Sequence, residues 1–170
     1  MTPVPESDWR AGAVSHRGPV GKATTVATNQ RFMPVPPQAV WDALADPGGY
    51  GYWVVGSKVI RDADADWPAP GSKFHHTIGV GPLEISDHTE SLEARAPTLL
   101  RIRAKGRPLG TAQVTLEMTP EDGGTMVRIT ENPDGVTALL SLNPLVHVAT
   151  KLRNAESLMR LEELALRRAA

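Results

Sequence analysis

Two titratable side chains alternate with apolar residues in segments whose composition is typical of β-strands. Glu131 follows Val127 and Ile129 at spacings of two, and His76 follows Phe74 in the same way. Residues two apart in a strand lie on one face of the sheet, so Glu131 and His76 are expected to face the interior. An inward carboxyl or imidazole group can exchange protons with a ligand, because its surroundings shift its pKa. Both residues are therefore candidate catalytic groups.

Each of the two also has a structural interpretation. Glu131 can pair with an arginine or with a backbone group near a packed helix. His76 can be a polar residue of a cavity wall, and it is a weak metal ligand candidate because its neighbour His75 points to the opposite face. The acidic run 62–66 lacks the Gly and Glu of a calcium-binding loop, and the chain has no cysteine. No metal ion or other cofactor is expected.

A stripe of basic residues at spacings of two could bind nucleic acid, and comprises Arg101, Arg103, Lys105 and Arg107. An acidic strand precedes it, and a hairpin with Glu90 opposite Arg101 would instead place charge pairs on a solvent-exposed face. This register turns Asp87 and Thr89 inward, and it needs a β-bulge between Asp87 and Leu92. The chain has 18 Lys and Arg against 19 Asp and Glu, so no nucleic-acid partner is expected.

The elements that position these residues follow from local patterns. The Thr- and Val-rich segment 24–33 predicts a first strand, and Pro36-Pro37 predicts a short helix that ends before Pro47. A second short helix or tight loop is expected at 50–53, where aromatic residues anchor the short helices to the sheet or contact a ligand. Six further strands are expected at 54–61, 74–80, 83–92, 99–105, 111–119 and 125–131. Short Pro- and Gly-rich turns between them favour an antiparallel meander.

The last part of the chain changes to helical periodicity. Asn143 and Pro144 are typical of a helix start, and a long helix is expected from there to the C-terminus. The predicted inward face of this helix consists of Val148, Leu152, Ala155 and Met159. A curved sheet around a long helix often leaves a cavity between them, and this helix face would form its roof.

Length and composition are those of one soluble domain. The chain has 170 residues, with 41% hydrophobic and 22% charged residues. Residues 1–22 show no sustained period and are expected to form an N-terminal arm, with a single domain at 23–170. The N-terminal residues do not resemble a signal peptide, and no apolar run is long enough to cross a membrane, so a cytoplasmic location without stable membrane insertion is expected.

Several motifs in this order resemble the START-like superfamily, also called SRPBCC, and in particular its bacterial polyketide cyclase/dehydrase branch. The matching segments are 36–47, Trp53, 67–72, 79–83, 107–110, 124–125, Glu131 and 153–158, within a region of resemblance of about 23–168. The resemblance implies an α+β helix-grip fold, with a curved seven-stranded antiparallel sheet wrapped around a long C-terminal helix and two short helices after the first strand. It also implies an internal pocket for an apolar, often polycyclic or lipid-like, ligand.

The expected function is the binding of a small hydrophobic, lipid- or polyketide-like molecule between the sheet and the long helix. The candidate ligand-binding residues are Trp53, Phe74, Ile78, Ile102, Leu116, Ile129, Val148, Leu152, Ala155 and Met159. One alternative is a polyketide cyclase or dehydratase that uses Glu131 and His76 as proton-transfer groups. A second alternative is a non-enzymatic protein-interaction module. A monomer or a homodimer is expected.

Overall fold

A computed structural model describes residues 27–80, 83–106, 110–134 and 143–170. The predicted N-terminal arm lies outside the described residues. The first strand, β1 (Ala27–Met33), is followed by helix α1 (Pro37–Leu44), a 3-10 turn η1 (Pro47–Gly49) and helix α2 (Tyr50–Trp53). The remaining elements are β2 (Ser57–Ala63), β3 (Lys73–Val80), β4 (Leu83–Arg95), β5 (Leu99–Gly106), β6 (Gly110–Glu121), β7 (Gly124–Asp134) and α4 (Pro144–Ala169).

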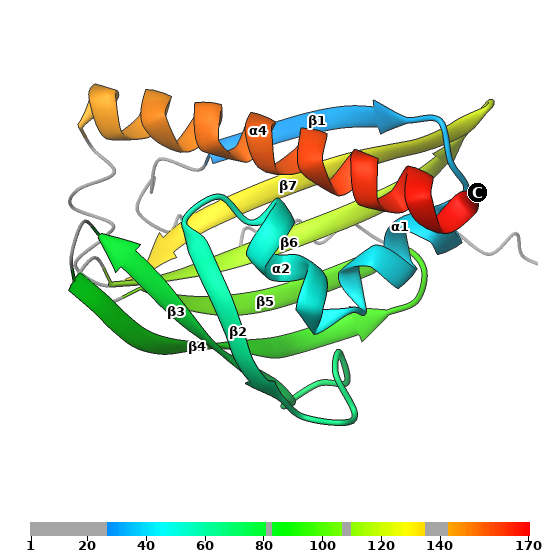
Figure 1. Ribbon diagram of the computed structural model, residues 1–170. Helices are drawn as coiled ribbons and strands as arrows, with labels where there is room; N and C mark the ends of the chain where they lie inside the picture. Colours follow the sequence, from blue (N-terminus) through cyan, green and yellow to red (C-terminus); the bar gives the residue numbers. More distant parts are fainter. Residues whose placement is uncertain (1–26, 81–82, 107–109, 135–142) are drawn as a thin grey trace, which may run out of the picture.

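The strands form one seven-stranded antiparallel sheet in the order β1-β7-β6-β5-β4-β3-β2. The sheet curves beneath α4, which runs across the top of Figure 1; α2 lies beside β2, and α1 lies near the C-terminal end of α4. Helix α4 packs against α1, α2, β1 and β7. The predicted α+β helix-grip architecture is therefore confirmed. None of the described helices combines the length and the apolar composition needed to cross a lipid bilayer.

The ends of the helices are set by local sequence, as predicted. Pro37 occupies the first turn of α1, where the missing N–H leaves no hydrogen bond unmade, and the helix ends ahead of Pro47. The Asn143 side chain caps α4 by accepting a hydrogen bond of 2.9 Å from the Leu145 backbone N–H. Basic residues fill the last turn of α4, where positive charge complements the helix dipole.

The register between β4 and β5 differs from the predicted one. Glu90 lies opposite Arg103 rather than Arg101, and Glu93 lies opposite Arg101. Up to Ser91 the pairing is displaced by two residues from the predicted one, and a bulge between Ser91 and Glu93 shifts it by one residue more. Cross-strand ion pairs nevertheless occupy this face, with N···O distances of 2.9 Å for Arg101–Glu93 and 3.7 Å for Arg103–Glu90.

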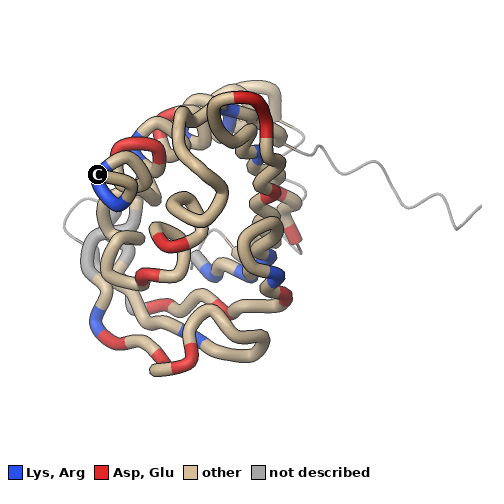
Figure 2. Tube along the Cα trace, turned by 90° about the vertical axis from the view of Figure 1, so that its right-hand side faces the viewer, with Lys and Arg blue, Asp and Glu red and all other residues tan. Residues whose placement is uncertain are grey.

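Charges on the described surface are mixed. Figure 2, seen from the C-terminal end of α4, shows acidic and basic residues intermixed along the trace rather than separated by sign. Within the described residues, the basic stripe of β5 is accompanied by carboxylates of β4, as the ion pairs above show. The described part of this stripe is thus explained by charge pairing.

The rotation of α4 about its axis is opposite to the prediction. The four residues predicted to face the sheet are exposed, with Val148 and Leu152 at 53% and 67%, and Ala155 and Met159 also on the outside. The buried residues of the helix are instead Asn154, Ser157, Leu158, Leu161 and Ala165. At 3.6 residues per turn the two sets lie on opposite sides of the helix. Apolar periodicity marks both sides, and the sheet contacts only one of them.

Polar contacts from both flanks hold α4 in this rotation. On one side the Asn29 amide of β1 donates a 3.1 Å hydrogen bond to the Lys151 carbonyl, and Arg31 pairs with Glu162. On the other side the Val55 backbone N–H donates to the Ser157 hydroxyl at 3.3 Å. These contacts come from segments more than 100 residues away in the chain, so local periodicity carries no information about them.

Candidate functional site

Aromatic side chains between α2 and the sheet form a compact cluster. The ring of Tyr50 lies 4.9 Å from that of Trp53, 4.5 Å from Phe74 and 5.7 Å from Trp67, measured between centroids. These are tilted and edge-on arrangements, which are the favourable ones for aromatic pairs. The Trp67 indole N–H donates to the Leu44 carbonyl at 3.3 Å, so its polar atom is satisfied within the protein.

Four polar atoms near this cluster are buried without a hydrogen-bond partner among the described residues. They are Tyr50 Oη, Trp53 Nε1, His76 Nδ1 and Asn154 Nδ2, and a fifth such atom, Asn29 Oδ1, lies on β1. The four residues are 1%, 2%, 5% and 2% exposed, respectively. Buried polar groups in proteins are nearly always paired, since an unpaired one costs about 1–3 kcal/mol. Four on the inner side of one fold therefore require an explanation.

Three different elements contribute these four atoms. Tyr50 and Trp53 come from α2, His76 from β3 and Asn154 from the buried face of α4. The His76 ring lies 5.6 Å from that of Phe74, which places it beside the aromatic cluster. The four groups thus belong to the space between the sheet, α2 and α4.

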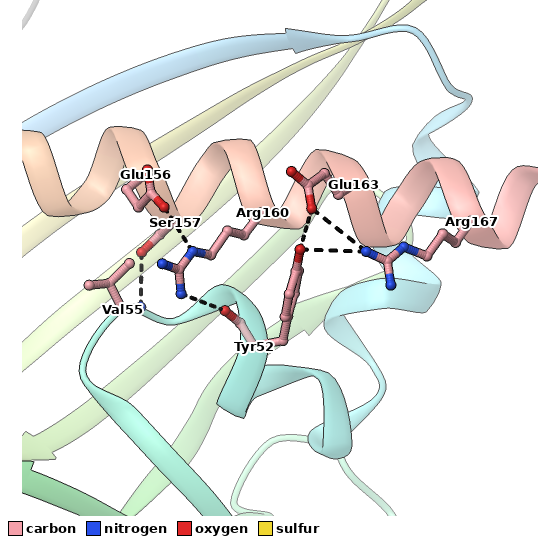
Figure 3. A network of polar contacts seen from close by, with 7 residues as sticks. All are labelled: Tyr52, Val55, Glu156, Ser157, Arg160, Glu163 and Arg167. Carbon is pink, nitrogen blue, oxygen red and sulfur yellow. Dashed lines mark hydrogen bonds and ion pairs between the residues drawn. The ribbon is translucent and has the colours of Figure 1, made fainter.

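Polar contacts join α2 to α4, the two helices that bear Trp53 and Asn154 (Figure 3). Arg160 donates to the Tyr52 carbonyl at 3.2 Å and to Glu156 at 2.9 Å, while the Tyr52 hydroxyl bonds to Glu163. The guanidinium carbon of Arg167 lies 5.4 Å from the centroid of the Tyr52 ring, at cation–π distance. Since Tyr52 is next to Trp53, this network attaches the end of α2 that bears Trp53 to the helix.

Asn154 is held on the same side by its helix. Ser157, one turn further along α4, accepts the hydrogen bond from Val55, two residues beyond Trp53. The Asn154 side-chain oxygen accepts a 3.1 Å hydrogen bond from Arg153, so only the amide nitrogen is left without a partner. The end of α2 and this turn of α4 thus present an indole N–H and an amide N–H to the same interior.

His76 lies beside a second buried polar residue. Its direct cross-strand partner on β4 is Asp87, which is 2% exposed and accepts a 2.9 Å hydrogen bond from the His88 backbone N–H. Burial lowers the pKa of His76 below its ordinary value, while the charge of Asp87 raises it, and burial is the larger effect. The imidazole is accordingly neutral at pH 7.

The hydroxyl of Tyr50 is neutral for a similar reason. Its complete burial raises its pKa far above the ordinary value, because a phenolate would lose its hydration. The unpaired groups described above are therefore a phenol, an indole, an imidazole and an amide, all without charge.

The other predicted catalytic residue has a different environment. Glu131 lies half-buried near the end of β7, and its carboxylate forms an ion pair with Arg153 of α4. This is the structural interpretation weighed from the sequence, in which an arginine near the helix neutralises the carboxylate. The structure does not bring Glu131 and His76 together as a described contact.

Burial of the inner face decreases toward this end of the sheet. On β5, Leu100 and Ile102 are 0% and 4% exposed, whereas Ala104, on the same face, is half-buried. On β6, Leu116 is buried and Val114 is half-buried. Figure 1 shows this end of the sheet beneath the N-terminal half of α4, whose residues 151–153 are exposed. The interior is therefore most accessible there.

The predicted ligand-binding residues divide into three groups. Those buried on the inner side are Trp53, Phe74, Ile102, Leu116 and Ile129. Ile78 lies in β3, but its side chain lies outside the described residues. The four helix residues face outward, so the prediction that they face the interior is wrong. As ligand contacts, the first five remain predictions.

Two residues with unpaired atoms were not among the candidate site residues. Tyr50 belongs to the aromatic residues at 50–53, for which anchoring and ligand contact were both open, and Asn154 lies in the matching segment 153–158 without an assigned role. An asparagine flanked by apolar positions at helical spacing, such as Leu158 and Leu161, was the available signal. Asp87 and Thr89, by contrast, were predicted to face inward, and both are buried.

Comparison with known families agrees with this architecture. The family described as polyketide cyclase / dehydrase and lipid transport matches residues 24–165. The chain belongs to this family. The resemblance to the START-like superfamily is confirmed with it. Among curated proteins, no relative matches the chain.

Solved structures share the fold at low sequence identity. Protein NE0264 from Nitrosomonas europaea is 18% identical, with 88% of this chain and 99% of that chain covered and a TM-score of 0.64. Protein MLL2253 from Mesorhizobium loti is 20% identical over 84% and 97%, with a TM-score of 0.63. Ara h 8.0201 is 14% identical over 83% and 97%, with a TM-score of 0.61. At these identities the likeness shows the fold alone.

Proposed function

We propose that the chain binds a small hydrophobic molecule in the interior between the sheet, α2 and α4. The observation that carries this proposal is the set of buried polar atoms without a protein partner, drawn from α2, β3 and α4. A bound molecule with a polar group would satisfy atoms that the protein leaves unpaired. The surrounding residues are aromatic and aliphatic, as in most small-molecule sites.

The exposure gradient along β5 and β6 supports the same conclusion. Half-buried Ala104 and Val114 continue the buried inner face toward the N-terminal half of α4. A ligand entering from this end would reach the aromatic cluster without separation of α4 from β1. The family description, which joins cyclase, dehydrase and lipid transport, fits an apolar ligand without naming one.

Binding can be tested with the neutral fluorescent probe N-phenylnaphthylamine and a pair of matched variants. Ala104→Phe adds a ring on the inner face, and Ala155→Phe adds the same ring on the exposed side of α4. The ring added in Ala104→Phe takes space that the probe would occupy, so probe binding should weaken about tenfold, whereas Ala155→Phe should leave it unchanged. Equal effects of the two variants, or no probe binding by the wild-type chain, would contradict the proposal.

Native mass spectrometry of the purified protein gives an independent measurement. A mass that is lost on denaturation identifies a bound molecule directly, and circular dichroism shows whether each variant is folded. A protein that carries no ligand and binds no probe would mean that side chains fill the interior.

A cyclase or dehydratase is a second candidate, and the position of His76 favours it. A buried imidazole beside the Asp87 carboxyl group on the inner face resembles a proton-transfer group held by an acidic neighbour. In this function His76 moves the proton, while Glu131 acts as a second group or holds Arg153. Conversion of a linear polyketone would be abolished by His76→Gln with probe affinity retained, and a carrier would show no conversion by either protein.

A further inference from the structure

The unpaired polar groups at the end of α2 and on α4 are all able to donate hydrogen bonds. Trp53 Nε1 and Asn154 Nδ2 can only donate hydrogen bonds, and neither has an acceptor among the described residues. The Tyr50 hydroxyl, which also lacks a partner, donates readily as well. A molecule that satisfies these groups must carry an acceptor oxygen or nitrogen.

The donors of α2 and α4 lie on two elements that contact each other directly. Tyr50 and Trp53 have ring centroids 4.9 Å apart, and the hydrogen bond from Val55 to Ser157 joins the end of α2 to the turn of α4 that bears Asn154. The acceptor end of a ligand would therefore lie against this junction. Its apolar part would extend along the inner face of β5 and β6 toward the half-buried end near Ala104.

The charge of the interior favours a neutral ligand. Among residues whose side chains are described, the buried polar and charged ones include no lysine or arginine. The only buried residue of this set with a negative charge is Asp87, whose field raises the pKa of His76, although burial keeps that imidazole neutral. A carboxylate placed here would lose its hydration, find no cation and face a like charge.

We infer that the ligand is a neutral molecule with a carbonyl-type acceptor oxygen, which it directs at Trp53 and Asn154, and that carboxylic acids such as fatty acids are excluded. This inference rests on the proposed function, because it names the chemical class of the molecule bound at the same site. The donors form hydrogen bonds to the ligand oxygen. An anionic ligand binds poorly because the described side chains include no buried cation.

Three naphthalene derivatives of nearly equal shape test the inference by displacing N-phenylnaphthylamine. Acetylnaphthalene carries a carbonyl oxygen, ethylnaphthalene has the same shape without it, and naphthoate is an anion at neutral pH. Naphthoate should bind at least about tenfold more weakly than acetylnaphthalene, because a buried charge without a partner is far more costly than a paired carbonyl.

A matched pair of tryptophan variants tests the donor. Trp53→Phe removes an indole N–H without a protein partner, and Trp67→Phe removes one that already donates to Leu44. In Trp53→Phe the affinity for acetylnaphthalene should fall about 3- to 10-fold, the usual range for one neutral hydrogen bond, while ethylnaphthalene binding changes less than about twofold. In Trp67→Phe the ratio of the two affinities should stay at its wild-type value.

The outcomes distinguish this inference from the proposed function. Probe binding together with naphthoate competing as well as acetylnaphthalene would overturn the inference and leave the interior site in place. An acetylnaphthalene-to-ethylnaphthalene ratio that is unchanged in folded Trp53→Phe would overturn it as well. Failure of the wild-type chain to bind the probe would overturn both.

Discussion

Replacing Asn154 by leucine should make the ligand-free protein more stable. Asn154 is 2% exposed on the buried face of α4, and its amide nitrogen has no partner among the described residues. Leucine is apolar and of similar size, so it removes the unpaired donor without opening a cavity. A gain in stability from the loss of a buried polar side chain is expected where that side chain serves a ligand rather than the fold.

The magnitude follows from three contributions. Removing an unpaired buried amide gains about 1–3 kcal/mol, and the better helix propensity of leucine adds a few tenths. The hydrogen bond that Arg153 donates to the Asn154 oxygen at 3.1 Å is lost, which costs about 1 kcal/mol, although Arg153 keeps its ion pair with Glu131. The net gain is about 1 kcal/mol, which raises Tm by roughly 2–4 °C in a chain of this size.

Urea and thermal unfolding of Asn154→Leu, compared with Ser157→Ala, measures this effect. Ser157 lies one turn away on the same buried face, but its hydroxyl accepts the Val55 N–H at 3.3 Å. Ser157→Ala should therefore lower stability by about 1 kcal/mol, the opposite sign. The reasoning is refuted if Asn154→Leu is less stable than the wild type, since the amide would then have a partner that matters to the fold. Asn154→Leu should also weaken acetylnaphthalene binding more than ethylnaphthalene binding.

Three further predictions concern the helix, a histidine and a glycine. Leu158→Ala should lower stability by about 3 kcal/mol because Leu158 is fully buried, while Leu152→Ala should change it by less than about 0.5 kcal/mol because Leu152 is 67% exposed. Comparable losses of the two variants in urea unfolding would contradict the rotation of α4 described above. Burial lowers the pKa of His76 below 6.5, so below about pH 6.5 the unfolded chain binds a proton that the folded chain does not, and stability falls with falling pH by up to about 1.4 kcal/mol per unit. His76→Gln should flatten this part of the profile, and an unchanged slope in pH-dependent unfolding would show that other groups produce it. Gly124→Ala should lower stability by about 3 kcal/mol, since its Cβ would overlap the Met33 carbonyl oxygen, and a wild-type Tm would show that the two strand ends do not approach so closely.

Features with a local cause were predicted from the sequence. The strands of the meander follow from alternating residues between Pro- and Gly-rich turns, and the start of α4 follows from Asn143 and Pro144. The inward position of His76 follows from the two-residue period of a strand, which needs no knowledge of its neighbours. The family resemblance supplied the closure of these elements into a helix-grip fold.

Features that depend on contacts between distant segments were decided only by the tertiary structure. Glu90 pairs with Arg103 rather than Arg101, and a bulge follows between Ser91 and Glu93, because the register of two strands depends on both of them together. The ion pair of Glu131 with Arg153 of α4 likewise joins two segments that no local pattern relates.

The rotation of α4 shows the same division most clearly. Its sequence contains one apolar stripe through Leu152 and another through Leu158, and periodicity identifies both without ranking them. Bonds from Asn29 and Val55 to the helix select the second stripe, and with it they turn Asn154 into the interior. The sequence by itself determined that a long amphipathic helix covers the sheet. Which face it buries, and therefore which polar side chain lies in the interior, depended on partners more than 100 residues away.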